Sequence, residues 1–294
     1  MGLEEKMVDI LSGKEVAQSI RKRAAADAKK LRTEGIIPKL VILRVGNDES
    51  SISYENSAMK VMKESNIETQ AITLDKDCAT EKVLDIIDEL NADDLVHGVI
   101  IMQPLPESIS RNELSDRLDP RKDVDGLSPI NLGRLVEGNS NAMAPSTPQA
   151  IIEMLDFYGY DLKGADVVVI GSSSTVGKPL SVMLSNRKAT VSNLHVYTKD
   201  NTLYSKNADI LISATGQLGL VDASYIKNGA VVIDVGFGYK NGKATGDVQF
   251  DNVLPLVSAI TPVPGGVGSV TTSVLASQVI KAAKILNEGV HADD

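Results

Sequence analysis

One segment of the sequence has the composition of a turn that binds phosphate. The apolar run Val167–Ile170 stops at Gly171, four small polar residues follow, and Gly177 opens a helical pattern. Small side chains let a diphosphate approach the backbone, and the first helical turn offers unpaired N–H groups and the positive end of its dipole. The spacing departs from G-x-G-x-x-G, since Ser173 stands at the second glycine and Gly177 comes one residue late. Because such turns also occur for packing, this segment alone indicates a nucleotide site without establishing it.

Four other segments carry polar or glycine-rich sequence at the ends of expected strands, where open parallel sheets bind ligands. They are Ser51–Lys63, with Tyr54, Lys60 and Lys63, then Gln103–Pro106, Asp123–Leu127 and Thr261–Gly268. Each alone is also ordinary turn chemistry, because Pro-Gly-Gly and Asp-Gly commonly mark turns. A functional interpretation therefore depends on their occurring together.

The elements that must position these segments alternate between short strand-like runs and longer helical patterns, which predicts an α/β fold with a mainly parallel sheet. Ser12–Glu15 has the pattern of a capping box opening a helix to about Leu31, and Thr147 before Pro148 predicts the start of another. The other predicted helices are residues 53–65, 80–90, 177–186 and 269–287, and the predicted strands are 40–45, 68–74, 96–102, 166–170, 190–195, 209–213 and 230–235. This order places a domain boundary near residue 145.

Composition narrows the class of protein. The 294 residues are 43% hydrophobic and 23% charged, which is typical of globular domains and long enough for two. A net charge of −9 argues against general nucleic-acid binding. One cysteine, Cys78, excludes an internal disulfide framework, and His97, His195 and His291 show no metal-ligand spacing. No apolar run approaches the roughly 20 residues of a membrane span and no secretory signal is visible, so we expect a cytoplasmic protein that binds neither membrane nor metal.

Taken together, the segments resemble the methylenetetrahydrofolate dehydrogenase/cyclohydrolase family. The matching motifs are the segment around Tyr54, Gln103–Pro106, Lys122–Gly126, Pro145–Pro148, Gly171–Pro179, Val232–Gly236, Gly246–Val248 and Ile260–Gly268. The Thr-Pro-Val-Pro-Gly-Gly-Val-Gly order in the last of them is the most diagnostic. The resemblance covers most of the chain.

This resemblance implies two α/β domains around a cleft and hydride transfer from 5,10-methylenetetrahydrofolate to NAD(P)+, giving 5,10-methenyltetrahydrofolate. It assigns residues 1–145 to a folate-binding catalytic domain, on which a C-terminal helix at 270–294 packs, and residues 146–269 to a Rossmann-type NAD(P)-binding domain. A cyclohydrolase step then gives 10-formyltetrahydrofolate in the family, and members are commonly homodimers. The implied ligands are tetrahydrofolate derivatives and NADP, or NAD in its place.

Roles for individual side chains follow from the same resemblance. Asp125 matches the aspartate that holds the pterin, where a carboxylate accepts from adjacent ring N–H groups. Tyr54 matches the tyrosine that packs along the folate, and Gln103 matches a glutamine beside the reacting carbons. The implied substrate contacts are Tyr54, Gln103, Pro104, Leu105, Asp125, Pro264, Gly265 and Gly266. The implied cofactor contacts are Gly171, Ser172, Ser173, Ser174, Val176, Gly177, His195, Thr198, Ala214, Thr215, Gly216, Asp234 and Gly236.

One departure bears on the chemistry. The family segment normally reads Tyr-x-x-x-Lys, with the lysine beside the reacting carbon, but Ala58 stands four residues after Tyr54. Lys60 does not replace it, because two helical positions turn a side chain by about 200°. The family lysine is tied mainly to the hydrolytic step, and acid–base assistance is commonly worth about 10²–10⁴ in rate. We therefore hypothesise a dehydrogenase with weak or absent cyclohydrolase activity.

Cofactor choice and overall activity leave alternatives open. Many relatives carry Arg after the first glycine, where it pairs with the 2′-phosphate of NADP, but this chain has Ser172. No acidic residue follows the second strand at His195 to select an unphosphorylated ribose, and Lys199 or Arg187 could supply positive charge, which favours NADP. The other interpretations are a fully bifunctional enzyme, a folate- or nucleotide-binding protein without catalysis, and an unrelated amino-acid dehydrogenase of similar outline.

Overall fold

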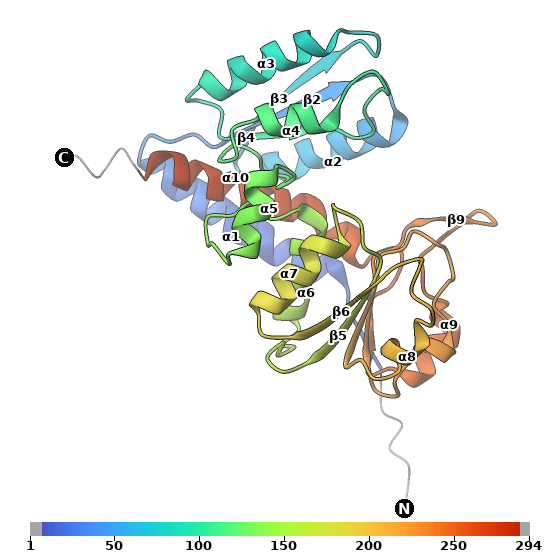
Figure 1. Ribbon diagram of the computed structural model, residues 1–294. Helices are drawn as coiled ribbons and strands as arrows, with labels where there is room; N and C mark the ends of the chain where they lie inside the picture. The colour runs from blue at the N-terminus through green and yellow to red at the C-terminus, as the bar shows by residue number, and fades with distance from the viewer. Residues whose placement is uncertain (1–7, 289–294) are drawn as a thin grey trace, which may run out of the picture. The chain divides into compact units, whose positions relative to one another are not determined.

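The computed structural model describes residues 8–288, and its chain divides into two compact units (Figure 1). Within the described residues, unit 1 comprises 8–17 and 147–271, and unit 2 comprises 18–146 and 272–288. Each unit contains its own parallel sheet. Within this part of the chain, none of the helices combines the length and hydrophobicity needed to cross a bilayer.

Unit 2 is built on a three-stranded parallel sheet in the order β3–β2–β4. Its strands are β2 Lys39–Val45, β3 Glu68–Leu74 and β4 Gly98–Ile101, and its helices are α1 Gly13–Thr33, α2 Glu49–Glu64, α3 Thr80–Ala92, α4 Arg111–Arg117, α5 Pro129–Val136 and α10 Thr271–Asn287. One apolar cluster joins one face of the sheet to α1, α2 and α10, and a second joins the other face to α3 and α4. Alternate residues of β2 enter the two clusters, as the two-residue period of a strand requires.

Unit 1 is built on a six-stranded parallel sheet in the order β1–β11–β8–β7–β5–β6. The strands are β1 Asp9–Ile10, β5 Asp166–Ile170, β6 Thr190–Leu194, β7 Ile210–Ser213, β8 Val231–Asp234 and β11 Ala259–Ile260. The helices are α6 Ser146–Phe157, α7 Gly177–Asn186, α8 Thr202–Ser205 and α9 Phe250–Val253, with short 3-10 turns at Ala223–Tyr225, Leu254–Leu256 and Val267–Ser269. The apolar strands β5, β7, β8 and β11 are buried on both sides, as expected when helices cover a parallel sheet, whereas β1 and β6 at the two edges are more exposed.

A separate hairpin leaves the end of β8 in unit 1. Strands β9 Gly238–Lys240 and β10 Lys243–Thr245 pair antiparallel across Asn241 and Gly242, which both have positive φ. Asn-Gly is the dipeptide that favours such a two-residue turn. The chain then returns through Gly246–Val248, and Val248 forms an isolated bridge with Val221.

Most predicted elements agree with the structure, and the differences have local causes. The bounds predicted for β3, β5 and α7 are confirmed. The predicted start of α2 at residue 53 is wrong, because the Asp48 carboxylate accepts from the Ser51 N–H at 2.9 Å and begins the helix at Glu49. The helix predicted to start at Thr147, which would make Thr147 its N-cap, begins earlier, since α6 already includes Ser146.

The N-terminal segment lies in a different unit from the one the sequence indicated. Residues 1–145 were predicted to form one domain, whereas β1 pairs in parallel with β11 in the sheet of unit 1. A two-residue strand carries no readable periodicity, so the sequence offered no pattern for it. Helix α10 packs in the apolar cluster of unit 2 together with α1 and α2.

Candidate active site

The loop that carries Asp125 is fixed by the neighbouring Asp123. The Asp123 Oδ2 accepts from the Ser128 N–H at 2.8 Å and from the Asn131 side-chain amide at 3.0 Å. Asn131 is fully buried, and its Oδ1 accepts from the Met143 N–H at 3.2 Å. Gly126 has a φ of +63°, and a Cβ there would overlap the Met143 carbonyl. The loop is therefore held against residues 143–144 with no room for a side chain at its turn.

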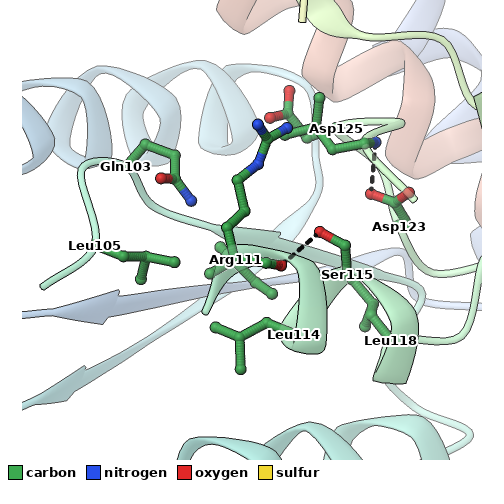
Figure 2. Close-up of a pocket in the computed structure, with 10 residues that line it drawn as sticks. Gln103, Leu105, Arg111, Leu114, Ser115, Leu118, Asp123 and Asp125 are labelled. Atoms are coloured by element: carbon green, nitrogen blue, oxygen red, sulfur yellow. Dashed lines mark hydrogen bonds between the residues drawn. The ribbon is translucent and has the colours of Figure 1, made fainter. Parts of the chain in front are cut away.

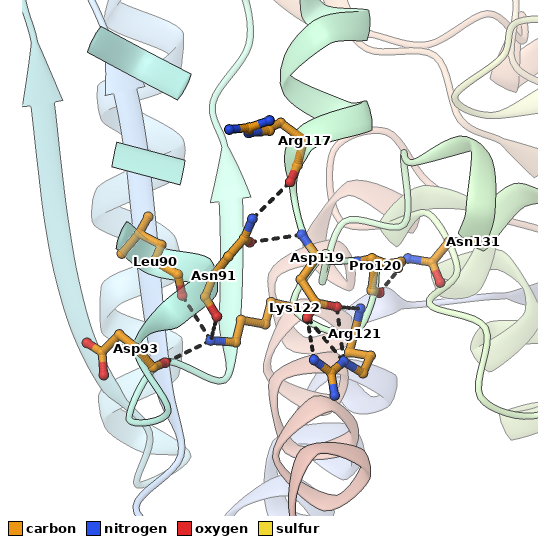
Figure 3. A network of polar contacts seen from close by, with 9 residues as sticks. All are labelled: Leu90, Asn91, Asp93, Arg117, Asp119, Pro120, Arg121, Lys122 and Asn131. Atoms are coloured by element: carbon orange, nitrogen blue, oxygen red, sulfur yellow. Dashed lines mark hydrogen bonds and ion pairs between the residues drawn. The ribbon is translucent and has the colours of Figure 1, made fainter. Parts of the chain in front are cut away.

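Lys122 anchors the same loop to the end of α3 (Figure 3). Its buried ammonium donates to three backbone carbonyls, those of Leu90 at 2.9 Å, Asn91 at 2.9 Å and Asp93 at 2.7 Å. The last carbonyls of a helix lack partners within it, and a cation there also interacts favourably with the helix dipole. Lys122 therefore has a positioning role, and its ammonium is occupied.

Asp125 itself keeps most of its hydrogen-bonding capacity. The Ser146 hydroxyl donates to its Oδ1 at 2.9 Å. Burial raises the pKa of Asp125 to about 6, although the Ser146 hydrogen bond and the positive charge of Arg111 oppose that rise. Figure 2 shows the Arg111 guanidinium directed toward this carboxylate from the first turn of α4. A partly buried carboxylate with few internal donors is suited to accept from a ligand.

A pocket in unit 2 adjoins Asp125 and contains side chains from three segments (Figure 2). Its lining residues are Ile101, Gln103, Leu105, Arg111, Leu114, Ser115, Leu118, Asp123, Asp125 and Leu127. Three residues predicted from the sequence, Gln103, Leu105 and Asp125, therefore lie around one cavity. Arg111 and Ser115, which the sequence did not single out, join them.

Tyr54 and Gln103 are both tied to α2. Ser51, in the first turn of that helix, donates its hydroxyl to the Gln103 carbonyl at 2.7 Å and thereby fixes the Gln103–Pro104 segment at the end of β4. Burial and the negative charge of Asp125 both raise the pKa of Tyr54 above its ordinary value, so its phenol is a neutral donor. The charge of Asp125 is therefore felt at the Tyr54 phenol.

Ala58 and Lys60 lie in different surroundings on α2. Ala58 has no exposed surface and belongs to the apolar cluster that also includes Met62. Lys60 is exposed and lines an open groove with Arg32 and Lys63 on the surface of unit 2. The structure thus agrees with the expectation that Lys60 does not occupy the position of the missing lysine.

In unit 1 the turn after β5 has the geometry of a phosphate-binding turn. Gly171 has a φ of +117°, and a Cβ at Gly177 would overlap the Gly171 carbonyl. Within residues 8–288, no protein acceptor takes the backbone N–H groups of Ser172, Ser174 and Thr175. These N–H groups lie immediately before α7, so the turn fits an anionic diphosphate.

The second glycine position has a different role from the usual one. The Ser173 hydroxyl accepts from the Val176 N–H at 3.1 Å and from the Gly177 N–H at 3.5 Å. The Ser173 side chain therefore closes the turn that leads into α7, which explains how a serine is accommodated in place of glycine. After β6, His195 and Thr198 form a closed turn in which the Thr198 N–H donates to the His195 carbonyl at 2.8 Å.

The remaining predicted cofactor residues of unit 1 differ in what they offer a ligand. Ala214, Thr215 and Gly216 form the turn after β7, and a Cβ at Gly171 would overlap the Ala214 carbonyl. The Asp234 carboxylate is buried and already accepts from three backbone N–H groups, those of Gly236, Asp247 and Val248. Asp234 therefore organises loops, and its predicted contact with cofactor stays a prediction.

The predicted glycine-rich loop and the two candidate cations also have definite places in unit 1. Pro264 and Gly265 are exposed, Gly266 is buried, and the Gly265 carbonyl accepts from the Gly13 N–H at 2.8 Å. The contact of these three residues with folate stays a prediction.

Arg187 follows the last residue of α7. At a rise of 1.5 Å per residue, it lies roughly 15 Å from the start of the helix. Its guanidinium pairs with the Asp156 carboxylate at 2.5 Å. It is therefore poorly placed for a 2′-phosphate, whereas Lys199 is exposed just after Thr198.

Two α/β units, one with a phosphate-binding turn at the carboxyl end of a parallel strand, define a dinucleotide-dependent oxidoreductase class. The sequence profile of the tetrahydrofolate dehydrogenase/cyclohydrolase catalytic domain matches residues 11–125, and that of the NAD(P)-binding domain of the same family matches residues 145–287. The chain therefore belongs to the tetrahydrofolate dehydrogenase/cyclohydrolase family.

Similar proteins cover nearly the whole chain. Bifunctional protein FolD of Alkaliphilus metalliredigens is 43% identical over 282 residues, which are 96% of this chain and 99% of that protein. The crystal structure of the bifunctional FolD dehydrogenase/cyclohydrolase from Campylobacter jejuni has a TM-score of 0.93 and 37% identity, and the match covers 95% of this chain and 99% of that one. The Trypanosoma brucei FolD complexed with NADP cofactor and inhibitor has a TM-score of 0.89 and 32% identity, over 97% of this chain and 99% of that one.

These comparisons confirm the predicted family and the predicted two-domain α/β fold. They also confirm that the chain is an NAD(P)-dependent enzyme of folate metabolism. The sequence analysis gave Ser51 no individual role and did not single out the other residues that support or line the site, which are Arg111, Ser115, Ser128 and Asn131. Only Ser128 carried a readable pattern, because Ser before Pro129 is typical of a helix start and its hydroxyl does cap α5.

Proposed function

We propose that this chain oxidises 5,10-methylenetetrahydrofolate with NADP as hydride acceptor. Asp125, Tyr54 and Gln103 hold the folate, and the turn from Gly171 to Gly177 holds the diphosphate of the cofactor. A C–H bond of the bridging methylene breaks, both electrons leave with the hydride to the nicotinamide, and the cationic 5,10-methenyl product forms. No protein group has to donate or accept a proton, so positioning and exclusion of water are what the protein contributes.

We further propose that hydrolysis of the methenyl product is weak or absent. The observation that carries this proposal is the full burial of Ala58 in an apolar cluster at the fourth position after Tyr54. Among the described residues that line the pocket beside Asp125, the one cation is Arg111. A guanidinium does not release its proton in proteins, so it cannot replace an amine as a proton carrier. Lys122 is unable to replace it either, because three carbonyls occupy its ammonium.

Substitution at Ala58 tests this part of the proposal. We expect Ala58→Lys to raise enzymatic hydrolysis of methenyltetrahydrofolate by about 10²-fold or more, which is the range of acid–base assistance. Ala58→Met is the matched control, because it adds a chain of similar length without an ammonium. Thermal denaturation of both variants reports whether the apolar cluster tolerates the longer side chain. Equal hydrolysis rates for two folded variants would contradict the proposal.

The rival function is the full bifunctional reaction. The names of the relatives from Alkaliphilus metalliredigens and Campylobacter jejuni favour it. The pKa of Asp125, at about 6, would also allow that carboxylate to exchange a proton near neutral pH. If Asp125 served as the base, the unaltered chain would hydrolyse the methenyl compound, and an enzyme-free control would separate that rate from spontaneous hydrolysis.

The choice of NADP rests on charge near the end of β6. Within the described chain Lys199 is exposed there, and no carboxylate belongs to the turn from His195 to Thr198. The Trypanosoma brucei relative was solved with NADP. Michaelis constants for NADP and NAD, measured side by side, test the preference. We expect Lys199→Met to raise the KM for NADP and to leave the KM for NAD unchanged.

A simple assay separates the proposed enzyme from the other interpretations. Reduced nicotinamide should form only when methylenetetrahydrofolate and the oxidised cofactor are both present. A binding protein without catalysis would form none, and an amino-acid dehydrogenase would not require the folate. The homodimer and the cytoplasmic location also stay proposals. Light scattering of the purified protein tests the homodimer.

A further inference from the structure

The segment Gly246–Val248 carries a buried carboxylate that belongs to none of the predicted contacts. Asp247 has no exposed surface. Its Oδ2 accepts from the Thr215 N–H at 2.7 Å, the Gly216 N–H at 3.2 Å and the Ser213 hydroxyl at 3.0 Å. One carboxylate oxygen thus accepts from the last residue of β7 and from two residues of the turn that follows it.

That turn packs directly on the phosphate-binding turn of the same unit. A Cβ at Gly171 would overlap the Ala214 carbonyl, and a Cβ at Gly177 would overlap the Gly171 carbonyl. Backbone therefore meets backbone from the start of α7 to the turn after β7, with no side chain between them to absorb a displacement. A shift of Thr215 and Gly216 would move atoms that touch the diphosphate turn.

Asp247 is itself held on both sides. The Asp234 Oδ1 accepts from the Asp247 N–H at 3.0 Å, and the Asp234 Oδ2 accepts from the Val248 N–H at 2.9 Å. The Asp247 carbonyl accepts from the Val221 N–H at 2.9 Å. Cβ atoms at Gly236 and Gly246 would overlap the Asp247 and Asp234 carboxylates respectively, so both glycines are needed for the close approach. The segment therefore offers the Asp247 carboxylate from a fixed support.

We propose that Asp247 is a positioning residue for the nicotinamide cofactor. It fixes the Thr215 and Gly216 amides, and through Ala214 and Gly171 it fixes the turn that receives the diphosphate. The inference rests on the proposed function of unit 1 as the site of NADP binding. It assigns the Gly246–Val248 motif a role in cofactor affinity that does not require any contact between Asp247 and the cofactor.

The experiment measures NADP binding by calorimetry in the absence of folate, together with hydrogen exchange at the Thr215 and Gly216 amides. Asp247→Ala removes the acceptor and should weaken NADP binding by about 10- to 100-fold, as expected for loss of several charge-assisted hydrogen bonds. Asp247→Asn keeps an acceptor oxygen and should weaken it less. Both amides should exchange faster in both variants. In the variants the KM for NADP should rise while the KM for folate stays within about twofold, since only positioning of the cofactor changes.

Two further variants keep the test decisive. Asp251→Asn, in the exposed first turn of α9, is the control and should bind NADP as the unaltered chain does. Ser213→Ala leaves the Asp247 carboxylate in place and removes only the hydroxyl that donates to it. This variant should therefore fold even if Asp247→Ala does not. It should weaken NADP binding by about threefold. The proposal is overturned if folded Asp247 or Ser213 variants bind NADP with unchanged affinity while the two amides exchange faster. If the unaltered chain binds neither NADP nor NAD, the proposed function itself fails.

Discussion

Asp125 in unit 2 and Asp234 in unit 1 have similar neighbouring sequences, but their carboxylates differ in how much hydrogen-bonding capacity they leave for a ligand. Each is followed closely by glycine, and burial raises the pKa of both to about 6. Asp234 accepts from three backbone N–H groups that lie in two segments, whereas the hydroxyl and the backbone N–H of a single residue, Ser146, act on Asp125, which also faces a pocket. Burial alone therefore does not identify a binding carboxylate. We propose that the internal donors separate Asp125, which is free to bind a ligand, from Asp234, which organises loops.

Matched substitutions of these two aspartates should have the largest effects, one on the KM for folate and the other on the free energy of unfolding. Asp125→Asn should raise the KM for methylenetetrahydrofolate by about 10²-fold, because charge-assisted hydrogen bonds to the pterin are lost. Asp234→Asn should lower the free energy of unfolding by about 3 kcal/mol, because an amide N–H₂ then faces buried N–H donors. Steady-state kinetics and denaturant unfolding of both variants check this. A folate KM that changes equally in both would remove the distinction.

Lys122 extends the comparison to a buried cation that acts on structure alone. Lys122→Met should lower the free energy of unfolding by about 3 kcal/mol, because three carbonyls at the end of α3 lose their donor. The exposed Lys60→Met is its control and should be neutral. Urea denaturation measures both. If Lys122→Met unfolds at the same urea concentration as the unaltered chain, the anchor drawn in Figure 3 contributes nothing.

The ionisation of Asp125 should make folate affinity depend on pH. With a pKa of about 6, the carboxylate is charged above pH 6 and protonated below it. Affinity for folate should therefore fall by up to about tenfold per pH unit as the pH drops below 6. The groups facing this carboxylate are Ser146, Asp123, Arg111 and Tyr54, and Asp125→Asn should remove the dependence. Binding titrations from pH 5 to pH 8 measure it.

The raised pKa of Asp125 affects the stability of the unliganded protein in the opposite direction to its effect on folate affinity. The folded pKa of Asp125 lies above its ordinary value of 3.8, so folding favours the protonated form. Stability contributed in this way is present at low pH and is lost as the pH rises through about 6. Asp125→Asn without ligand should thus raise the melting temperature at pH 8 and have less effect at pH 5. A lower melting temperature at pH 8 would contradict this assignment.

The smallest expected effects concern the two groups that assist Asp125. Ser146→Ala should raise the folate KM by about threefold at pH 7, since one hydrogen bond to the carboxylate is lost, and should move the acid limb of binding to higher pH. Arg111→Met should move that limb in the same direction, and Arg111→Lys should restore it. Arg117→Met on the same helix is the control, because Arg117 pairs with Asp88 at the surface. If folate affinity falls at the same acid pH in Ser146→Ala and Arg111→Met as in the unaltered chain, neither group acts on Asp125.

Much of this fold follows from local pattern. The bounds of β3, of the apolar strand β5 and of the helix after Gly177 were predictable to the residue from local sequence. The proposed role of Asp125 rests on the family resemblance, which gives no information about the residues that surround this carboxylate. Ser146 and Arg111 reach Asp125 from positions 21 and 14 residues away, and no local pattern reports such contacts.

The roles of the carboxylates that organise loops were harder to predict from the sequence than the surroundings of Asp125. The family resemblance implied that Asp234 contacts the cofactor, but its carboxylate accepts from the N–H groups of residues 236, 247 and 248, the last two of which follow the hairpin. The hairpin itself carried a readable Asn-Gly pattern at 241–242. The two-residue strands β1 and β11 carry no period at all, so their pairing is visible only in three dimensions.

The most direct test of the account is the stoichiometry of products from one preparation of the unaltered chain. The amounts of reduced NADP and of accumulated methenyltetrahydrofolate are measured after mixing with methylenetetrahydrofolate, with enzyme-free hydrolysis subtracted. We expect one methenyltetrahydrofolate for each reduced NADP formed. Formation of 10-formyltetrahydrofolate at a rate comparable to hydride transfer would contradict it.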